Sequence, residues 1–202
     1  MNIIKQNEIE KIVDILKNNG VVAIATDTVF GVCATTKSNK AFQNLLKVKD
    51  RPKEKAFPIM CADIEDMRKV AIIDDEAEKI INHFMPGPLT IIAKKNKDVA
   101  KYIGNNETVA IRMATSSTLK SIIELLGEPI FMTSANKSGE EEYSSIEEIV
   151  ERLPLVDGVV ESSPSYERAS TIYDSINKKV LREGPITEKE IKNILKEKDD
   201  ER

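Results

Sequence analysis

The sequence predicts an α/β protein with a largely parallel sheet, antiparallel additions, and helices covering both faces. Short apolar runs rich in β-branched residues alternate with amphipathic runs of helical period along almost the whole chain. Glycine, proline and asparagine separate these runs. Hydrophobic residues make up 41% and charged residues 32% of the 202 residues, a balance that can bury a sizeable core.

The predicted helices carry apolar residues three or four positions apart, so that one face of each is apolar. Two of them begin with a capping box, Ser145 with Glu148 and Thr187 with Glu190. The predicted helices are residues 9–16, 41–48, 64–70, 76–84, 119–126 and 146–153, and one more after Thr187.

The predicted strands are short apolar runs bounded by turn-forming residues. Pro86-Gly87-Pro88 precedes one of them, and Asn177-Lys178 stands where a hairpin turn would join the last two. The predicted strands are residues 21–25, 57–61, 89–93, 109–112, 130–133, 156–160, 171–174 and 180–182. Because no linker or repeat divides the chain, we expect one domain over residues 1–190 and a frayed, charged tail over residues 191–202.

Composition excludes several classes of protein. No apolar stretch approaches the roughly 20 residues that a membrane-spanning helix needs, and residues 1–11 lack the layout of a secretory signal. Cys33 and Cys61 lie far apart inside apolar runs, which favours buried, reduced thiols over a disulfide or a nucleophile. We therefore expect a soluble protein of the reducing cytoplasm, with no membrane partner.

The single histidine and the net charge exclude or disfavour further kinds of site and function. One histidine excludes histidine-rich metal sites, and because no G-x-S-x-G elbow accompanies His83, we expect it to be a structural residue at a helix end. A net charge of −4 argues against a protein whose main task is to coat nucleic acid. The missing G-x-x-x-x-G-K-[ST] motif excludes a P-loop NTPase.

Polar side chains follow several predicted strands, where ligands bind in open α/β sheets. Thr26-Asp27-Thr28 could hold an amine and a hydroxyl of a small substrate, or could simply close a turn. Lysine and arginine crowd residues 47–55, where Arg51 could fork two phosphate oxygens or belong to a solvated, charged loop. Arg112 ends an apolar run and needs an anionic partner, either a carboxylate ligand or a structural ion pair.

The later strands are followed by similar residues. Residues 133–139 are rich in hydroxyl and amide groups, which suit a phosphate or sugar cradle as well as ordinary turn chemistry. Ser144 could cap a helix, Ser170 precedes one strand, and Arg182 is a second arginine at a strand end. Each segment is a weak signal alone, and their order along the chain carries the prediction.

In that order the motifs resemble those of the YrdC family of threonylcarbamoyl-adenylate synthases, in its short, single-domain form. The matching segments span residues 25–184 and are Ala-Thr-Asp-Thr-Val-Phe-Gly-Val, Lys-Val-Lys-Asp-Arg-Pro, Met-Pro-Gly-Pro-Leu-Thr, Val-Ala-Ile-Arg, Thr-Ser-Ala-Asn-Lys-Ser-Gly, Ala-Ser-Thr-Ile-Tyr-Asp and Leu-Arg-Glu-Gly. The resemblance implies a twisted, mostly parallel open sheet around a concave site.

The resemblance also implies a reaction, in which L-threonine, bicarbonate and ATP give threonylcarbamoyl-AMP and pyrophosphate. The adenylate would pass to tRNA threonylcarbamoyl transferase proteins that modify tRNA, and RNA itself is a possible partner. By resemblance, the residues that hold threonine are Thr28, Arg112, Ser134 and Ser170. The residues that contact ATP are Lys49, Arg51, Lys55, Thr108, Asn136, Ser144 and Arg182. Lys49 and Arg51 would be catalytic through charge neutralisation, with Mg²⁺ carried by the nucleotide and no protein metal site.

The chain departs from the family pattern at several positions. Ala25 stands where the family usually has proline, Phe30 and Val32 replace a tyrosine and a leucine, and Met60 replaces a polar residue. A YciO-like paralogue without robust synthase activity is therefore the alternative within the fold. An RNA-binding module is the alternative of another class, which 4% aromatic content and net acidity disfavour.

Overall fold

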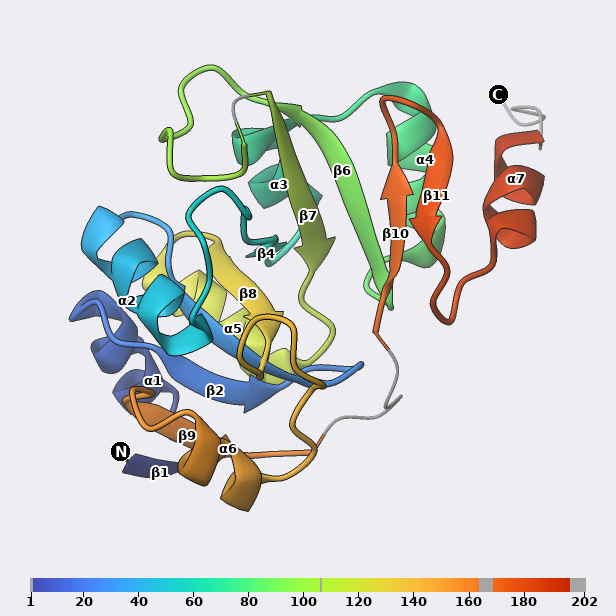
Figure 1. Ribbon diagram of the computed structural model, residues 1–202. Coiled ribbons are helices and arrows are strands. Elements are labelled where there is room, and N and C mark those ends of the chain that lie inside the picture. The colour runs from blue at the N-terminus through green and yellow to red at the C-terminus, as the bar shows by residue number, and fades with distance from the viewer. Residues whose placement is uncertain (1, 106, 164–168, 197–202) are drawn as a thin grey trace.

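The computed structural model describes residues 2–105, 107–163 and 169–196. In these residues a single twisted sheet runs through the molecule, with the strand order β1-β9-β2-β3-β8-β4-β7-β6-β10-β11 and β5 paired to β6 (Figure 1). The strands are β1 (Asn2–Lys5), β2 (Val22–Ala25), β3 (Phe30–Thr35), β4 (Ile59–Cys61), β5 (Ala71–Ile72), β6 (Leu89–Lys95), β7 (Thr108–Met113), β8 (Ile130–Ser134), β9 (Gly158–Glu161), β10 (Thr171–Asp174) and β11 (Lys179–Arg182).

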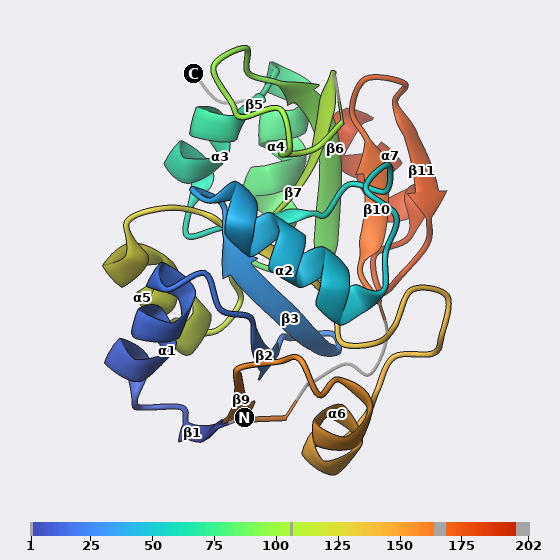
Figure 2. The same ribbon diagram turned by 60° about the vertical axis from the view of Figure 1, so that its left-hand side comes forward.

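The helices lie on both faces of this sheet (Figure 2). They are α1 (Ile9–Lys17), α2 (Asn39–Lys49), α3 (Ile64–Val70), α4 (Asp75–Phe84), α5 (Ser117–Leu126), α6 (Ile146–Arg152) and α7 (Glu188–Lys196). None of the helices in the described ranges is long and apolar enough to cross a bilayer. The predicted α/β class, with its open sheet and flanking helices, is confirmed.

The strands alternate between two hydrophobic clusters because their side chains point to opposite faces in turn. In β8, Ile130 and Met132 pack with α1 and α5, whereas Phe131 packs with α2 on the other face. Met60 of β4 is fully buried in the α1–α5 cluster. The sequence pattern of β-branched and aromatic residues therefore becomes two apolar layers, one on each side of the sheet.

The pairing of the strands is mixed. Parallel pairs join β1 to β9, β9 to β2, β4 to β7 and β6 to β10. Antiparallel pairs join β2 to β3, β3 to β8, β8 to β4, β7 to β6, β6 to β5 and β10 to β11. Antiparallel pairing is thus more extensive than the alternation of strands and helices in the sequence indicates. Two of the antiparallel pairs, β2–β3 and β10–β11, are joined by short polar turns.

Three strands were not predicted: β1, β3 and β5. Strand β3 is buried throughout, and it begins at Phe30, directly after the polar turn of residues 26–29. Its six residues contain Gly31 and two small residues, so they do not form the β-branched run that indicates a strand. Strands β1 and β5 have only four and two residues.

Several local predictions are confirmed. Ser145 Oγ accepts the Glu148 N–H at 3.1 Å at the start of α6, and Thr187 and Glu190 bond reciprocally at the start of α7. The hairpin turn at Asn177-Lys178 joins β10 to β11. His83 lies in the last turn of α4.

The prediction of buried, reduced cysteines is confirmed, and the predicted C-terminal tail is partly helical. Cys33 and Cys61 are free and buried, and burial raises the pKa of the Cys33 thiol to about 12. Helix α7 runs to Lys196 and Ile191 is 1% exposed, so helical structure continues past residue 190. Residues 197–202 of the predicted tail lie outside the described residues.

Candidate functional site

A cavity of about 350 Å³ lies on the sheet where the turn between β2 and β3 meets strands β6, β7, β8, β10 and β11. We call it the central cavity. It is lined by Thr26, Thr28, Val29, Gly31, Arg51, Ala56, Pro58, Thr90, Ile92, Ala110, Arg112, Met132, Thr133, Ser134, Glu142, Ala169, Ser170, Ile172 and Arg182. Six of the eleven predicted site residues are in this set: Thr28, Arg51, Arg112, Ser134, Ser170 and Arg182.

The turn between β2 and β3 is closed by its own threonine. Thr26 Oγ1 accepts the backbone N–H groups of Thr28 and Val29 at 3.1 and 3.2 Å, and donates to the Val29 carbonyl at 2.7 Å. Turn formation, one of the two alternatives for this segment, is therefore confirmed for Thr26. Gly31 follows this turn, and a Cβ there would lie 2.5 Å from Met132 Sδ and 3.2 Å from the Thr133 carbonyl oxygen, so a larger residue would require the Met132 side chain to move.

Arg112 lies near the end of β7, with its guanidinium between the central cavity and Asp27. Its Nη2 donates to Asp27 Oδ1 at 2.5 Å, and the two side chains are only 8% and 10% exposed. Nη1 lies 3.5 Å from Thr28 Oγ1. Arg112 Nε and Asp27 Oδ2 have no hydrogen-bond partner although both are buried. Arg112 is thus a member of a structural ion pair and also lines the cavity.

Lys49 ends α2 and is 1% exposed. Its Nζ donates to the Ser134 carbonyl and to Asn136 Oδ1, both at 2.5 Å. Asn136 in turn accepts from Ser134 Oγ at 2.7 Å and donates to the Glu140 carbonyl at 2.6 Å. Lys49 and Asn136 do not line the cavity themselves. The lysine holds the Ser134-Ala135-Asn136 loop from behind.

The environment of Lys49 lowers its pKa to about 7, because burial disfavours the charged form and Arg51 lies nearby. Glu142 opposes this effect. The ammonium has only neutral oxygens as hydrogen-bond partners. Lys49 is therefore a buried base whose charge is sensitive to pH near neutrality.

Arg51 is held in the cavity wall by its own loop. Its Nε and Nη2 donate to the carbonyls of Lys55 and Ala56 at 2.9 and 2.8 Å, and its guanidinium lies 5.0 Å from the centre of the Phe57 ring. Partial burial lowers its pKa. The basic segment is therefore more than a solvated loop, although the side chain of Lys55 is exposed and does not line the cavity.

Ser170 and Arg182 are joined by the β10–β11 hairpin. Arg182 Nε and Nη2 donate to the Ser170 carbonyl at 3.0 and 2.9 Å, and the Ser170 and Thr90 hydroxyls are 2.9 Å apart. Burial lowers the pKa of Arg182, and Glu142 opposes the shift. Arg182 therefore supplies a third guanidinium to the cavity wall, beside the Ser170 and Thr90 hydroxyls.

Two further predicted ATP contacts, Thr108 and Ser144, do not line the central cavity either. Thr108 shares a face of β7 with Ala110 and Arg112, but it is four residues before Arg112, roughly 13 Å along the strand. Ser144 lines a neighbouring pocket that shares Val29 and Glu142 with the central cavity.

Sequence reasoning assigned no role to two polar residues that line the cavity, Thr90 and Glu142. Glu142 belongs to three consecutive glutamates, which are typical of a solvated loop, so no signal in the sequence distinguishes it from its neighbours. In the described part of the chain, no group of three or more histidine, cysteine, aspartate or glutamate side chains could hold a metal ion. One cavity carboxylate suits an ion held mainly by substrate phosphates.

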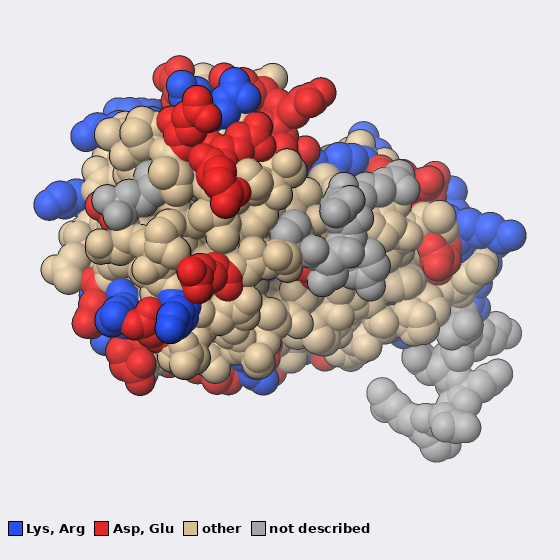
Figure 3. Space-filling model, turned by 90° about the horizontal axis from the view of Figure 1, so that it is seen from below, with Lys and Arg blue, Asp and Glu red and all other residues tan. Residues whose placement is uncertain are grey.

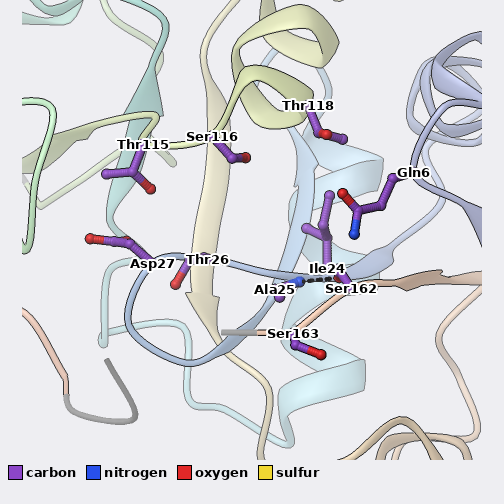
Figure 4. Close-up of a pocket in the computed structure, with 10 residues that line it drawn as sticks. All are labelled: Gln6, Ile24, Ala25, Thr26, Asp27, Thr115, Ser116, Thr118, Ser162 and Ser163. Atoms are coloured by element: carbon purple, nitrogen blue, oxygen red, sulfur yellow. Dashed lines mark hydrogen bonds between the residues drawn. The ribbon is translucent and has the colours of Figure 1, made fainter. Parts of the chain in front are cut away.

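A smaller pocket of about 130 Å³ adjoins the turn of residues 26–28 on its other side (Figure 4). We call it the side pocket. Asp27 and Thr115 lie at one end of it, and Gln6 and Thr118 lie at the other. Thr115 Oγ1 is buried and has no hydrogen-bond partner. Asp27 thus stands between Arg112, which lines the central cavity, and a pocket lined by hydroxyl groups.

Comparison with known proteins identifies relatives of this chain. A protein of Methanocaldococcus jannaschii provisionally named threonylcarbamoyl-AMP synthase is 33% identical over 91% of this chain and 90% of its own length. The threonylcarbamoyl-AMP synthase of Aliivibrio fischeri is 34% identical over 72% of this chain and 80% of its own length.

Solved structures of two related proteins have a similar fold. The crystal structure of P. abyssi Sua5 complexed with L-threonine has a TM-score of 0.90 and 27% identity over 97% of this chain, which spans 61% of the Sua5 chain. The crystal structure of E. coli YciO has a TM-score of 0.84 and 25% identity over 94% of this chain and 98% of its own. The model of the Sua5–YciO–YrdC family, with the description "Telomere recombination", matches residues 14–184. This chain belongs to the Sua5–YciO–YrdC family.

Proposed function

We propose that the protein is an L-threonylcarbamoyladenylate synthase, which converts L-threonine, bicarbonate and ATP to threonylcarbamoyl-AMP and pyrophosphate. The observation that carries this proposal is the convergence of Thr28, Arg51, Arg112, Ser134, Ser170 and Arg182 on one cavity. These residues come from segments that are far apart in the sequence. Together they supply guanidinium groups for carboxylate and phosphate and hydroxyls for a small polar substrate.

The amino acid is placed at Arg112, with its carboxylate on the guanidinium and with Thr28, Ser134 and Ser170 around it. The ATP phosphates are placed at Arg51 and Arg182, with the adjacent pocket at Ser144 beside the nucleotide. The assignments of Lys49, Lys55, Thr108 and Asn136 to ATP stay predictions, because none of these side chains lines the cavity.

The chemistry requires positioning more than acid–base catalysis. The threonine nitrogen forms a bond to the bicarbonate carbon and water is lost, which gives a carbamate. A carbamate oxygen then bonds to the α-phosphorus as the bond to pyrophosphate breaks. Arg51 and Arg182 offset the charge that develops on the phosphates, and Lys49 keeps the Ser134-Ala135-Asn136 loop in place. Mg²⁺ bound with ATP would supply further charge neutralisation, and Glu142 is a carboxylate of the cavity lining that could help to hold it.

The named relatives support the proposal, because the one at 34% identity is named threonylcarbamoyl-AMP synthase and the one at 33% identity is provisionally given the same name. We further propose that the reaction takes place in the cytoplasm. The product would pass to tRNA threonylcarbamoyl transferase proteins, because an acyl adenylate needs an acceptor before water hydrolyses it.

The RNA-binding alternative finds less support. Lys49 is buried and Arg51 lies in the wall of the central cavity, so these two cations do not belong to an exposed basic stripe for RNA. On the face shown in Figure 3, acidic side chains form the largest charged group, and the basic side chains are scattered.

The test supplies ATP, L-threonine, bicarbonate and Mg²⁺ to the purified protein and measures pyrophosphate and an adenylate of the expected mass. We expect release to require all three substrates, and to fall about 100-fold or more in Arg51→Ala. Lys53→Ala is the matched control, because Lys53 is an exposed cation of the same loop that does not line the cavity. Release that does not depend on threonine would refute the proposal, and the absence of any release would favour the YciO-like alternative.

A further inference from the structure

Among the described residues that line the central cavity, Glu142 is the one with a carboxylate. Three guanidinium groups line the same cavity, those of Arg51, Arg112 and Arg182. Glu142 is exposed, and within the described part of the chain its carboxylate has no hydrogen bond or ion pair. A negative group therefore stands unpaired in a cavity whose other charges are positive.

Glu142 also lines the neighbouring pocket of about 630 Å³ that contains Ser144, which we call the Ser144 pocket. Of the residues that the structure describes, only Val29 and Glu142 line both this pocket and the central cavity. Because Val29 is apolar, Glu142 is the charged group at the junction of the two. A nucleotide with its phosphates in the central cavity and its nucleoside in the Ser144 pocket has to pass Glu142.

The charge of Glu142 reaches the basic side chains around this path. Burial lowers the pKa of Arg182 and of Lys49, and the negative charge of Glu142 opposes both shifts. The same charge acts on any phosphate that lies beside these cations, because like charges at short range repel each other. Glu142 thus makes the junction less favourable for a bare triphosphate than the three arginines alone would.

A divalent cation that arrives with the triphosphate reverses this interaction. Magnesium in proteins is usually held by one or two carboxylates together with substrate phosphates, and it keeps several of its waters. In the described ranges no group of three or more histidine, cysteine, aspartate or glutamate side chains could hold a metal ion by itself. A single carboxylate beside the phosphate path therefore fits a cation that the nucleotide carries in.

We propose that Glu142 makes the site selective for the magnesium complex of a nucleoside triphosphate over the metal-free triphosphate. This inference rests on the proposed function and deepens it, because it specifies the form in which the nucleotide binds. Arg51 and Arg182 attract both forms. Glu142 provides the discrimination, since its carboxylate repels the metal-free phosphates and attracts the cation of the complex.

The test measures binding of the β,γ-imido analogue of ATP by calorimetry, once with Mg²⁺ and once with EDTA in its place. In the wild type we expect binding to be roughly 10- to 100-fold tighter with Mg²⁺. In Glu142→Gln we expect this ratio to fall to roughly a tenth of the wild-type value, because binding with Mg²⁺ weakens and binding without it tightens.

Glu141→Gln is the matched control. It removes the same charge from the neighbouring residue, which is also exposed but does not line the central cavity. We expect this variant to keep the wild-type ratio. Because both glutamates are exposed, we expect both variants to fold as the wild type does, and thermal unfolding measured alongside binding checks this.

Four outcomes would overturn the inference. An unchanged ratio in Glu142→Gln would mean that the carboxylate acts on neither phosphate nor cation. An equal change in Glu141→Gln would mean that the acidic loop acts only through its total charge. Equal wild-type affinity with and without Mg²⁺ would overturn the inference and leave the proposed function standing, whereas a wild type that binds the analogue under neither condition would overturn both.

Discussion

The protein buries two basic side chains next to the same cavity, and the two differ in their ion-pair and hydrogen-bond partners. Arg112 has a carboxylate partner, Asp27, yet one of its nitrogens is left without a hydrogen bond. Lys49 has no carboxylate partner, and its ammonium is bound by two neutral oxygens, of Ser134 and Asn136. The comparison indicates two different roles. Arg112, which is incompletely bonded, lines the cavity where a ligand would bind, and Lys49 supports the Ser134-Ala135-Asn136 loop.

The largest expected effect comes from breaking the ion pair. Arg112→Gln leaves the Asp27 carboxylate buried without its cation, and this should lower the free energy of unfolding by about 3–5 kcal/mol. Threonine-dependent pyrophosphate release should fall below detection. Urea denaturation and the pyrophosphate assay measure the two effects.

A smaller loss of stability should follow removal of the lysine. Lys49→Met leaves the Ser134 carbonyl and Asn136 Oδ1 without this donor, which should cost about 1–3 kcal/mol of unfolding free energy. Because the Ser134-Ala135-Asn136 loop loses its support, we expect weaker binding of a non-hydrolysable ATP analogue. Lys47→Met is the control, since Lys47 is an exposed residue of the same helix. Equal effects in the two variants would contradict the supporting role of Lys49.

The same lysine should make stability depend on pH. Its pKa is about 7 in the folded protein, against an ordinary value of 10.5. Between these values the unfolded chain binds a proton that the folded chain does not, so unfolding free energy should rise with pH. We expect the wild type to gain stability relative to Lys49→Met from about pH 7 to pH 10, as urea denaturation at several pH values would measure. A difference that is constant over this range would show that the lysine stays charged when folded.

The smallest effect is expected far from both buried cations. Asp74 caps α4, and its side chain accepts the Ala77 N–H at 2.8 Å. Asp74→Ala should lower unfolding free energy by about 1 kcal/mol and leave pyrophosphate release unchanged. A change in turnover would mean that losses of stability alone affect the assay, and the results for Arg112 and Lys49 would then need correction for folding.

Local sequence patterns were sufficient for most of the elements. Periods of three to four residues predicted each helix, and capping residues such as Ser145 and Thr187 located helix starts because their bonds span only three positions. Strand β3 was missed because Gly31 and the small residues Cys33 and Ala34 interrupt the β-branched pattern, and its strand structure comes from pairing with β2 and β8.

The sequence likewise predicted part of the site and not the rest. Residue type and order predicted that Thr28, Arg51, Arg112, Ser134, Ser170 and Arg182 belong together, and they line one cavity. The sequence offered no means to foresee that Glu142 lines the cavity too, or that Lys49 bonds to Asn136 and does not line it. Those outcomes depend on loop paths, which residues distant in sequence determine.

By itself, the sequence determined the alternation of helices and strands, the burial of the two cysteines and the set of residue types available for chemistry. These follow from periodicity and polarity, which act over a few neighbouring residues. Only the tertiary structure decided that Asp27 pairs with Arg112, and that Lys49 lies behind the cavity wall. Such pairings join residues 85 and 87 positions apart, and their energies depend on burial and distance, which exist only once the sheet has formed.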